Sequence, residues 1–228
     1  MAAANGRMVW DLPLRLAHWA LVITVAGAWA THYAGTDWFA WHRRLGYTTL
    51  VLAAFRVVWG FIGTRHARFA SFLGGPRRVL DHLRRKGRNA SVGHNPLGAL
   101  GVVAMLAALL VQGATGLFAN DEIVNAGPFY GWVSQQASNR ITWLHETNSN
   151  LLLGLIVLHV AAIGWHAGVA RQPLVRAMFT GRKDAAEVPP DQAIDGSRTG
   201  LAAAIVAALA VALALAIRAA PEATIALF

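Results

Sequence analysis

The sequence predicts an all-α membrane protein: a four-helix transmembrane bundle followed by a fifth, C-terminal transmembrane helix. Of its 228 residues, 56% are hydrophobic and only 14% are charged, whereas soluble domains are about one quarter charged. Five apolar stretches are long enough to cross a hydrocarbon layer of about 30 Å, which needs roughly 20 helical residues. The chain contains no cysteine, which excludes disulfides, zinc–thiolate sites and lipid attachment through a thiol.

The five apolar stretches differ in how they begin and in what they contain. They cover residues 14–33, 42–63, 97–118, 143–168 and 201–217. The third is preceded by Asn95 and Pro96, and proline suits the first turn of a helix. The fifth consists almost entirely of Ala, Leu, Val and Ile. Its alanines allow close helix packing, so it is expected to pack on a partner or to anchor the chain.

The segment before the fifth stretch has a different composition from the rest. Residues 188–197 contain proline, aspartate and serine, which is typical of a linker. The chain is therefore expected to consist of three parts. These are a four-helix membrane domain at 9–183, a linker at 184–200, and an additional transmembrane helix with its tail at 201–228.

Lysine and arginine concentrate in two of the connections and predict the orientation. Residues 64–93 contain eight basic residues and one acid, and residues 170–200 contain five more basic residues. The opposite connections, at 34–41 and 119–142, are nearly free of them. The positive-inside rule then predicts a cytoplasmic N-terminus, outside connections at 34–41 and 119–142, and an outside C-terminus. Topology also explains the formal charge of +9, and no nucleic-acid motif is present.

Histidines near the ends of the apolar stretches are the candidate functional residues, because ionisable side chains in a bilayer are costly and mark functional sites. His145 and His159 lie on one predicted helix, about 21 Å apart along its axis and about 40° apart around it. In the predicted orientation, His42 and His145 lie toward the outer face, and His18 and His159 toward the inner face. Two pairs at two depths, contributed by three helices, suit two bis-histidine metal cofactors between the helices of a bundle.

Haem is the metal cofactor that this chain is expected to hold. Iron–sulfur clusters are normally bound by thiolates, and covalent haem attachment also needs cysteine, so the bundle is predicted to bind non-covalent haem. Each histidine could instead bond to a carbonyl or to a neighbouring helix. In addition, His32 lies fourteen residues from His18 and could replace His42. Four histidines near the inner interface or in the basic loop are expected not to be ligands: His66, His82, His94 and His166.

Three arginines lie on the side of the membrane that the positive-inside rule disfavours, namely Arg43, Arg44 and Arg140. Haem propionates are carboxylates that point to the membrane surface, and arginine binds carboxylates through paired, charge-assisted hydrogen bonds. These arginines are therefore expected around the outer propionates, and Arg15, close to His18, around the inner ones. Snorkelling of the side chains to the interface is the alternative. Arg56, deep in the second stretch, needs a partner that the sequence does not identify.

Five segments carry a resemblance to a known family. They are WDLPLRLAHW at 10–19, WHRRLGY at 41–47 with FRVVWGF at 55–61, HNPLG at 94–98, and LHETNSNLLLGLIVLH at 144–159. On these motifs, which cover most of residues 9–183, the chain resembles the bacterial cytochrome b561 family, including the cytochrome b subunits of nickel–iron hydrogenases. The long basic loop and the fifth stretch depart from the minimal family pattern and leave the partner open.

The resemblance implies a four-helix di-haem membrane core with two b-type haems. It implies iron ligands at His18, His42, His145 and His159, which favours His42 over His32. It also implies electron exchange between the quinone pool, as ubiquinone or menaquinone, and a second redox protein. That partner is expected to be a periplasmic cytochrome c or a hydrogenase-like protein, and whether the chain forms a homo-oligomer is left open.

Two other functions compete with electron transfer as interpretations of the sequence. Bis-histidine ligation leaves iron without an open position, which favours electron transfer over oxygen activation. A stand-alone superoxide:quinone oxidoreductase is the enzymatic alternative, with Arg43, Arg44 and Arg140 providing a cationic path to the outer haem. A transporter with histidine relays would need a continuous titratable path and broken helices, neither of which the fourth stretch shows. The direction of electron flow and the role of the fifth helix cannot be read from the sequence.

Overall fold

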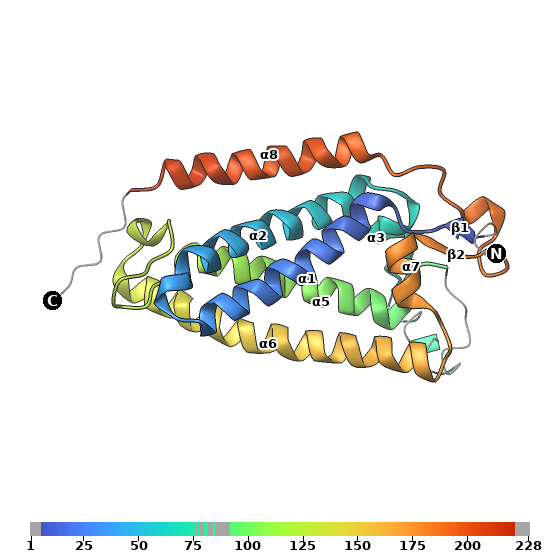
Figure 1. The fold of residues 1–228 in the computed structure, drawn as a ribbon, viewed down its shortest axis with the longest axis horizontal. Helices are drawn as coiled ribbons and strands as arrows, with labels where there is room; N and C mark the ends of the chain where they lie inside the picture. The colour runs from blue at the N-terminus through green and yellow to red at the C-terminus, as the bar shows by residue number, and fades with distance from the viewer. Residues whose placement is uncertain (1–5, 76, 78–79, 82–83, 85–91, 222–228) are drawn as a thin grey trace. The chain divides into compact units, whose positions relative to one another are not determined.

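The computed structural model describes residues 6–75, 77, 80–81, 84 and 92–221. In this part of the chain, five helices are long and apolar enough to cross a membrane, which confirms the prediction of an all-α membrane protein with five spans. The long helices are α1 Leu12–Tyr33, α2 Phe39–Ile62, α5 Pro96–Gly116, α6 Gln135–Gly168 and α8 Thr199–Arg218. They can be followed in Figure 1 from α1 in blue to α8 in red.

Polar side chains cap two of these helices close to the starts that the sequence suggested. At α1, Asp11 Oδ1 accepts the Leu14 backbone N–H at 2.7 Å. At α5, Asn95 Oδ1 accepts the Gly98 N–H at 2.7 Å, and Pro96 is the first helical residue. Both bonds satisfy donors that the start of a helix leaves open, so the two helices begin where a capping residue is available.

Helix α6 begins two turns before the predicted start at 143. It starts at Gln135, where the Ser134 side chain accepts the Ala137 N–H at 3.3 Å and the Ser134 carbonyl accepts the Ser138 N–H at 2.9 Å. The added turns are largely polar, so hydropathy does not mark them. Capping therefore extends this helix beyond its apolar part.

The chain divides into two compact units, and each of them contains parts of α1, α2, α5 and α6. Unit 1 comprises Met1–His18, Arg56–Met105 and Leu155–Ala202. Unit 2 comprises Trp19–Phe55, Leu106–Gly154 and Ala203–Phe228. Each unit has its own buried side chains, such as Val9 and Trp59 in unit 1 and Ala53 and Phe55 in unit 2.

Unit 1 contains two short strands that the all-helical prediction did not include. Strands β1 Gly6–Met8 and β2 Arg182–Asp184 pair in antiparallel fashion, with Arg7 opposite Lys183. The short helices of this unit are η2 Arg65–Ala67, α3 Phe69–Phe72, α7 Leu174–Thr180 and η4 Pro190–Gln192. The strand pair joins the start of the described chain to the segment that follows α7.

The stretch 188–197, whose composition is typical of a linker, is held on unit 1 by hydrogen bonds. The Arg7 guanidinium donates to the carbonyls of Ala185 and Val188. The Ile194 N–H donates to the Met8 carbonyl at 3.0 Å. Val188 is completely buried. The segment therefore has a defined path in spite of its composition.

Unit 2 is held together by polar bonds between its otherwise apolar helices. Trp29 on α1 donates to Ser149 on α6 at 2.8 Å, and Thr49 on α2 donates to Thr24 on α1 at 2.9 Å. The loop between α5 and α6 folds on itself, with Asp121 Oδ1 accepting three successive backbone N–H groups. It includes η3 Tyr130–Trp132. These bonds fix the helix parts that carry two of the predicted histidine ligands.

Candidate functional site

The four histidines singled out by the sequence come together in two pairs, one in each unit. In unit 1, the ring centroids of His18 on α1 and His159 on α6 lie 6.4 Å apart, with 55° between the ring planes. In unit 2, the centroids of His42 on α2 and His145 on α6 also lie 6.4 Å apart, with 78° between the planes. All four side chains are half-buried. Helix α6 thus provides one histidine to each pair.

The spacing within each pair fits two axial ligands of one metal ion. With metal–nitrogen bonds of about 2.0–2.1 Å and each ring centroid about 1.1 Å beyond its nitrogen, two trans imidazoles would have centroids roughly 6.3 Å apart. Among the described residues, no group of three or more His, Asp or Glu could hold a bare metal ion. Two protein ligands suit an iron already held by the four nitrogens of a haem, so the residues present fit that group.

Backbone carbonyls set the tautomer of both unit 2 histidines. The His42 Nδ1 lies 2.8 Å from the Ala28 carbonyl oxygen, and the His145 Nδ1 lies 3.0 Å from the Gln112 carbonyl oxygen. A carbonyl can only accept, so the proton is on Nδ1 and the lone pair is on Nε2. A hydrogen bond of this kind orients a metal-binding imidazole and leaves the correct nitrogen for the metal.

A polar network around His145 was missed by the sequence reasoning. The Asn148 amide donates to the Ala108 carbonyl at 2.9 Å and to Gln112 Oε1 at 2.7 Å. The Gln112 Nε2 lies 3.0 Å from His145 Nε2, and Thr115 Oγ1 lies 3.1 Å from His145 Nδ1. The available signal was a few polar residues within apolar helices. A metal at His145 Nε2 would require the Gln112 amide to turn aside.

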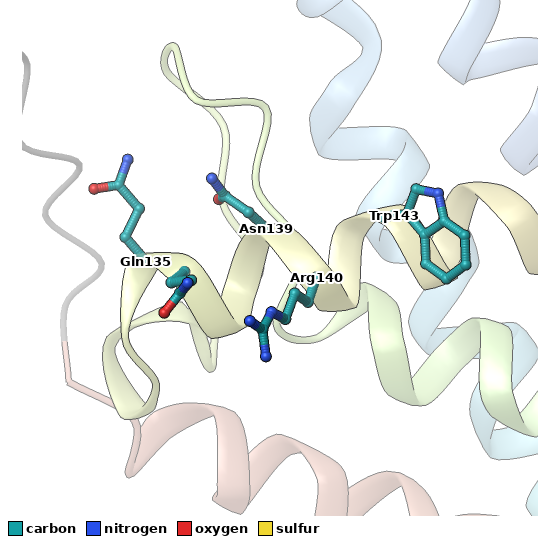
Figure 2. A pocket seen from close by; sticks show the side chains of 5 residues that line it. Gln135, Asn139, Arg140 and Trp143 are labelled. Carbon is teal, nitrogen blue, oxygen red and sulfur yellow. The ribbon is translucent and has the colours of Figure 1, made fainter.

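Three of the predicted propionate-binding arginines lie in unit 2. The guanidinium carbons of Arg43 and Arg44 lie over the rings of Phe39 and Trp41, at 5.5 and 5.0 Å from their centroids. Arg140 lines a surface hollow of about 650 Å³ on α6, and Figure 2 shows it in the first turns of that helix. The hollow is also lined by Gln135, Gln136, Asn139 and Trp143. The two cation–π contacts are what interfacial placement of arginine would give.

The remaining charged and histidine candidates have other contacts. Arg15 donates to the Phe179 carbonyl, and its Nε is buried without a hydrogen bond to any described residue. The exposed His32 lies 5.8 Å from His42 and 5.1 Å from Tyr33, measured between ring centroids. The histidines expected not to be ligands have contacts outside the two pairs.

His66 Nε2 lies 2.7 Å from the Gln192 carbonyl oxygen, and His166 Nδ1 lies 3.1 Å from Gln172 Oε1. His94 packs against Trp10 and Phe72. His82 lies outside the described residues.

Comparison with known proteins identifies the family. A family model described as prokaryotic cytochrome b561 matches residues 9–181. The chain belongs to the prokaryotic cytochrome b561 family. It is therefore a multi-pass membrane electron-transfer protein of the b-type cytochrome class, which implies haem b. The matched range ends before α8, so the fifth helix lies outside the part that defines the family.

Two relatives of this cytochrome are similar over most of its length. Proteins named "Probable Ni/Fe-hydrogenase B-type cytochrome subunit" from Azotobacter chroococcum mcd 1 and Azotobacter vinelandii are each 28% identical to it over 219 residues. Each alignment covers 80% of this chain and 90% of the relative. No solved structure matches the chain.

Proposed function

We propose that this cytochrome holds two haem b groups, one between His18 and His159 and one between His42 and His145. The observation that carries the proposal is the centroid separation of 6.4 Å in both pairs, which is the spacing that two imidazoles need on one iron. When bound, haem would supply one-electron redox chemistry, and the two histidines of each pair would hold its iron for electron transfer. Residues 9–183 form the di-haem domain in this proposal.

The protein's own residues orient the ligands and balance the charge. The carbonyls of Ala28 and Gln112 hold the Nδ1 protons of His42 and His145, and the surrounding apolar helices limit water. In this proposal Arg43, Arg44 and Arg140 bind the outer propionates, and Arg15 binds an inner one. The aromatic contacts of Arg43 and Arg44 leave interfacial anchoring as the competing role for those two.

The electron transfer runs between quinone and a second redox protein in this proposal. Two relatives are named as hydrogenase cytochrome subunits, which supports a hydrogenase-like partner, and a periplasmic cytochrome c is the alternative. The basic residues of 64–93 and 170–200 support a bacterial inner-membrane location with the N-terminus in the cytoplasm and the C-terminus in the periplasm. Ubiquinone and menaquinone are both compatible with the sequence.

A superoxide:quinone oxidoreductase is the second candidate, and one observation favours it. Arg43 and Arg44 directly follow His42, and both side chains are exposed. A small anion could be attracted to the outer haem by this pair of cations. Reduction of the purified cytochrome by superoxide, measured by stopped-flow absorbance, separates the two functions. A rate that falls in Arg43→Gln/Arg44→Gln supports the enzyme, and absence of reduction excludes it.

Single histidine variants of the purified protein test the haem proposal. The visible spectrum should show reduced b-type bands, and the pyridine haemochrome assay should give two haems per chain. His42→Ala and His145→Ala should each remove one haem, and His18→Ala and His159→Ala the other, so that each variant keeps about half of the signal. His32→Ala is the matched control and should keep both. Loss of haem in His32→Ala with both retained in His42→Ala would reassign the outer ligand.

A further inference from the structure

Arg56 on α2 is a buried cation whose terminal nitrogens have no hydrogen-bond partner among the described residues. Its side chain is only 6% exposed, and both Nη1 and Nη2 are buried. The guanidinium carbon lies 5.3 Å from the centroid of the Phe69 ring, which is a cation–π contact and provides no hydrogen-bond acceptor oxygen. A buried charge without a hydrogen-bonding partner is strongly unfavourable, so the two terminal nitrogens favour an anion as their partner.

Asp11 is the acid that interacts electrostatically with Arg56, but it is not the hydrogen-bond partner of the guanidinium. Asp11 is completely buried and lies within electrostatic range of Arg56. Its Oδ1 accepts from the Leu14 backbone N–H at 2.7 Å, its Oδ2 accepts from Trp59 Nε1 at 3.1 Å, and Oδ2 also accepts from the Thr64 hydroxyl. The carboxylate is thus occupied by other donors. It offsets part of the charge on Arg56 but does not bond to it.

His94 lies close to both Arg56 and His159, a member of the inner histidine pair. The His94 ring packs against Trp10 and Phe72, with centroids 4.8 and 4.7 Å away. It lies within electrostatic range of Arg56, Lys183, His66 and His159, and burial followed by Arg56 lowers its pKa to about 3. His94 is therefore neutral at physiological pH. Arg56 and the inner ligand His159 are therefore both within electrostatic range of one neutral ring, and Arg56 and Lys183 are the Lys and Arg side chains that act on it.

We propose that Arg56 binds a propionate carboxylate of the haem held between His18 and His159. The inference rests on the haem sites of the proposed function and adds a residue to the inner one. A non-covalent haem carries two carboxylates, and a guanidinium with two free terminal nitrogens matches one of them in paired geometry. Arg15, proposed above for an inner propionate, has less of its guanidinium available for paired bonds, because its Nη1 already donates to the Phe179 carbonyl.

The test uses the intact, haem-loaded protein and two substitutions at the same position. Arg56→Gln removes the charge, and Arg56→Lys keeps the charge without the paired geometry. Arg198→Gln is the control, since this exposed arginine of unit 1 donates to the Ile62 carbonyl. Potentiometric titration measures the midpoint of each haem. Redox-difference infrared spectra with haem labelled with ¹³C at its propionate carboxyls report the carboxylates themselves.

Arg56→Gln should lower the midpoint of one haem and leave the other unchanged, because loss of a nearby cation favours the ferric state. The label-sensitive carboxylate bands should shift in Arg56→Gln, shift less in Arg56→Lys, and stay in place in Arg198→Gln. Bands and midpoints identical to those of the wild type in Arg56→Gln would overturn the inference. An equal shift of both midpoints with unmoved bands would overturn it as well, because that result indicates a lipid or solvent anion as the partner.

Two outcomes separate this inference from the proposal on which it rests. If Arg56→Gln does not retain the inner haem, the carboxylate bands of Arg56→Lys become the test. Carboxylate bands of Arg56→Lys at the wild-type position would refute the contact between Arg56 and the propionate. If the wild-type protein binds fewer than two haems, the proposed function fails whatever Arg56 does. If two haems are present and the bands of the Arg56 variants do not move, only the inference about Arg56 fails.

Discussion

Replacement of Gly116 by alanine should loosen the outer haem through a contact with His145. Gly116 is the last residue of α5, and its backbone is not in the left-handed region, so alanine is sterically compatible with its φ. A Cβ added there would lie 3.0 Å from His145 Cε1 and 3.4 Å from Nδ1. Ordinary contacts begin at about 3.4 Å, as in the carbon–carbon separations of packed interiors. The imidazole would therefore have to move by a few tenths of an ångström.

Such a shift is large for an oriented metal ligand. The His145 ring is fixed by its bonds to the Gln112 carbonyl and the Thr115 hydroxyl, so it cannot move without lengthening one of them. Disturbing the groups that orient a metal ligand typically costs 10- to 100-fold in affinity, or about 1.4–2.8 kcal/mol. We expect this loss for the haem between His42 and His145, with the other haem unaffected.

The assay is the transfer of haem from the purified protein to an excess of an apoprotein acceptor. Gly116→Ala should release half of its haem faster than the wild type by roughly the factor given by the affinity loss. Gly154→Ala is the matched control, because a Cβ at this α6 position meets nothing within 4 Å. That variant should lose haem at the wild-type rate. Equal release from the two variants would refute both the contact and the assignment of His145 as a ligand.

Two further outcomes follow from the same structure. Asp11→Asn removes the charge from a carboxylate that is completely buried and accepts hydrogen bonds from Leu14, Trp59 and Thr64. It should therefore lower the free energy of unfolding of the detergent-solubilised protein by about 1–3 kcal/mol. Thermal unfolding measures this loss, and an unchanged melting temperature would contradict it. Reporter fusions after Lys183 and after Phe228 should report opposite sides of the membrane, because the basic residues of 64–93 oppose translocation; the same side for both would mean that α8 does not cross.

The sequence predicted those parts of the fold that depend on hydropathy and on spacing along one helix. The fourteen-residue separation of His145 and His159 identified the two ends of one span, and α6 does carry both. The apolar stretches predicted five spans, and the described part of the structure has five helices long and apolar enough to cross a membrane. These features are local in the chain, so they can be recognised without knowing which segments meet.

Features that depend on contacts between distant segments were not predictable in this way. Strands β1 and β2 are three residues each and more than 170 positions apart, which is too short for an alternating pattern to show. Gln112 and Asn148 each stand as a polar residue in an apolar helix, and their bond to each other appears only when α5 and α6 are packed. The path of 188–197 likewise depends on Arg7, which precedes Val188 by 181 positions in the sequence and donates to its carbonyl.

The loop after α5 gives a final prediction, because it closes over the same helix end that faces His145. The Gly127 N–H donates to the Ala119 carbonyl at 2.7 Å, and a Cβ on Gly127 would lie 2.4 Å from the Leu117 carbonyl oxygen and 2.5 Å from that of Gly116. These are backbone atoms, so a side-chain rotation cannot relieve the clash, and overpacking of this kind costs about 1–3 kcal/mol.

Gly127→Ala should therefore displace the end of α5 and loosen the outer haem as Gly116→Ala does, although the atoms nearest to its Cβ belong to the backbone of Gly116 and Leu117. Gly131→Ala is the control, since a Cβ there meets only Pro221, whose closest atom, Cγ at 3.0 Å, belongs to the side chain. Haem transfer should be accelerated for half of the haem in Gly127→Ala and unchanged in Gly131→Ala. If Gly127→Ala unfolds at a lower temperature but releases haem at the wild-type rate, the loop stabilises the protein without positioning His145.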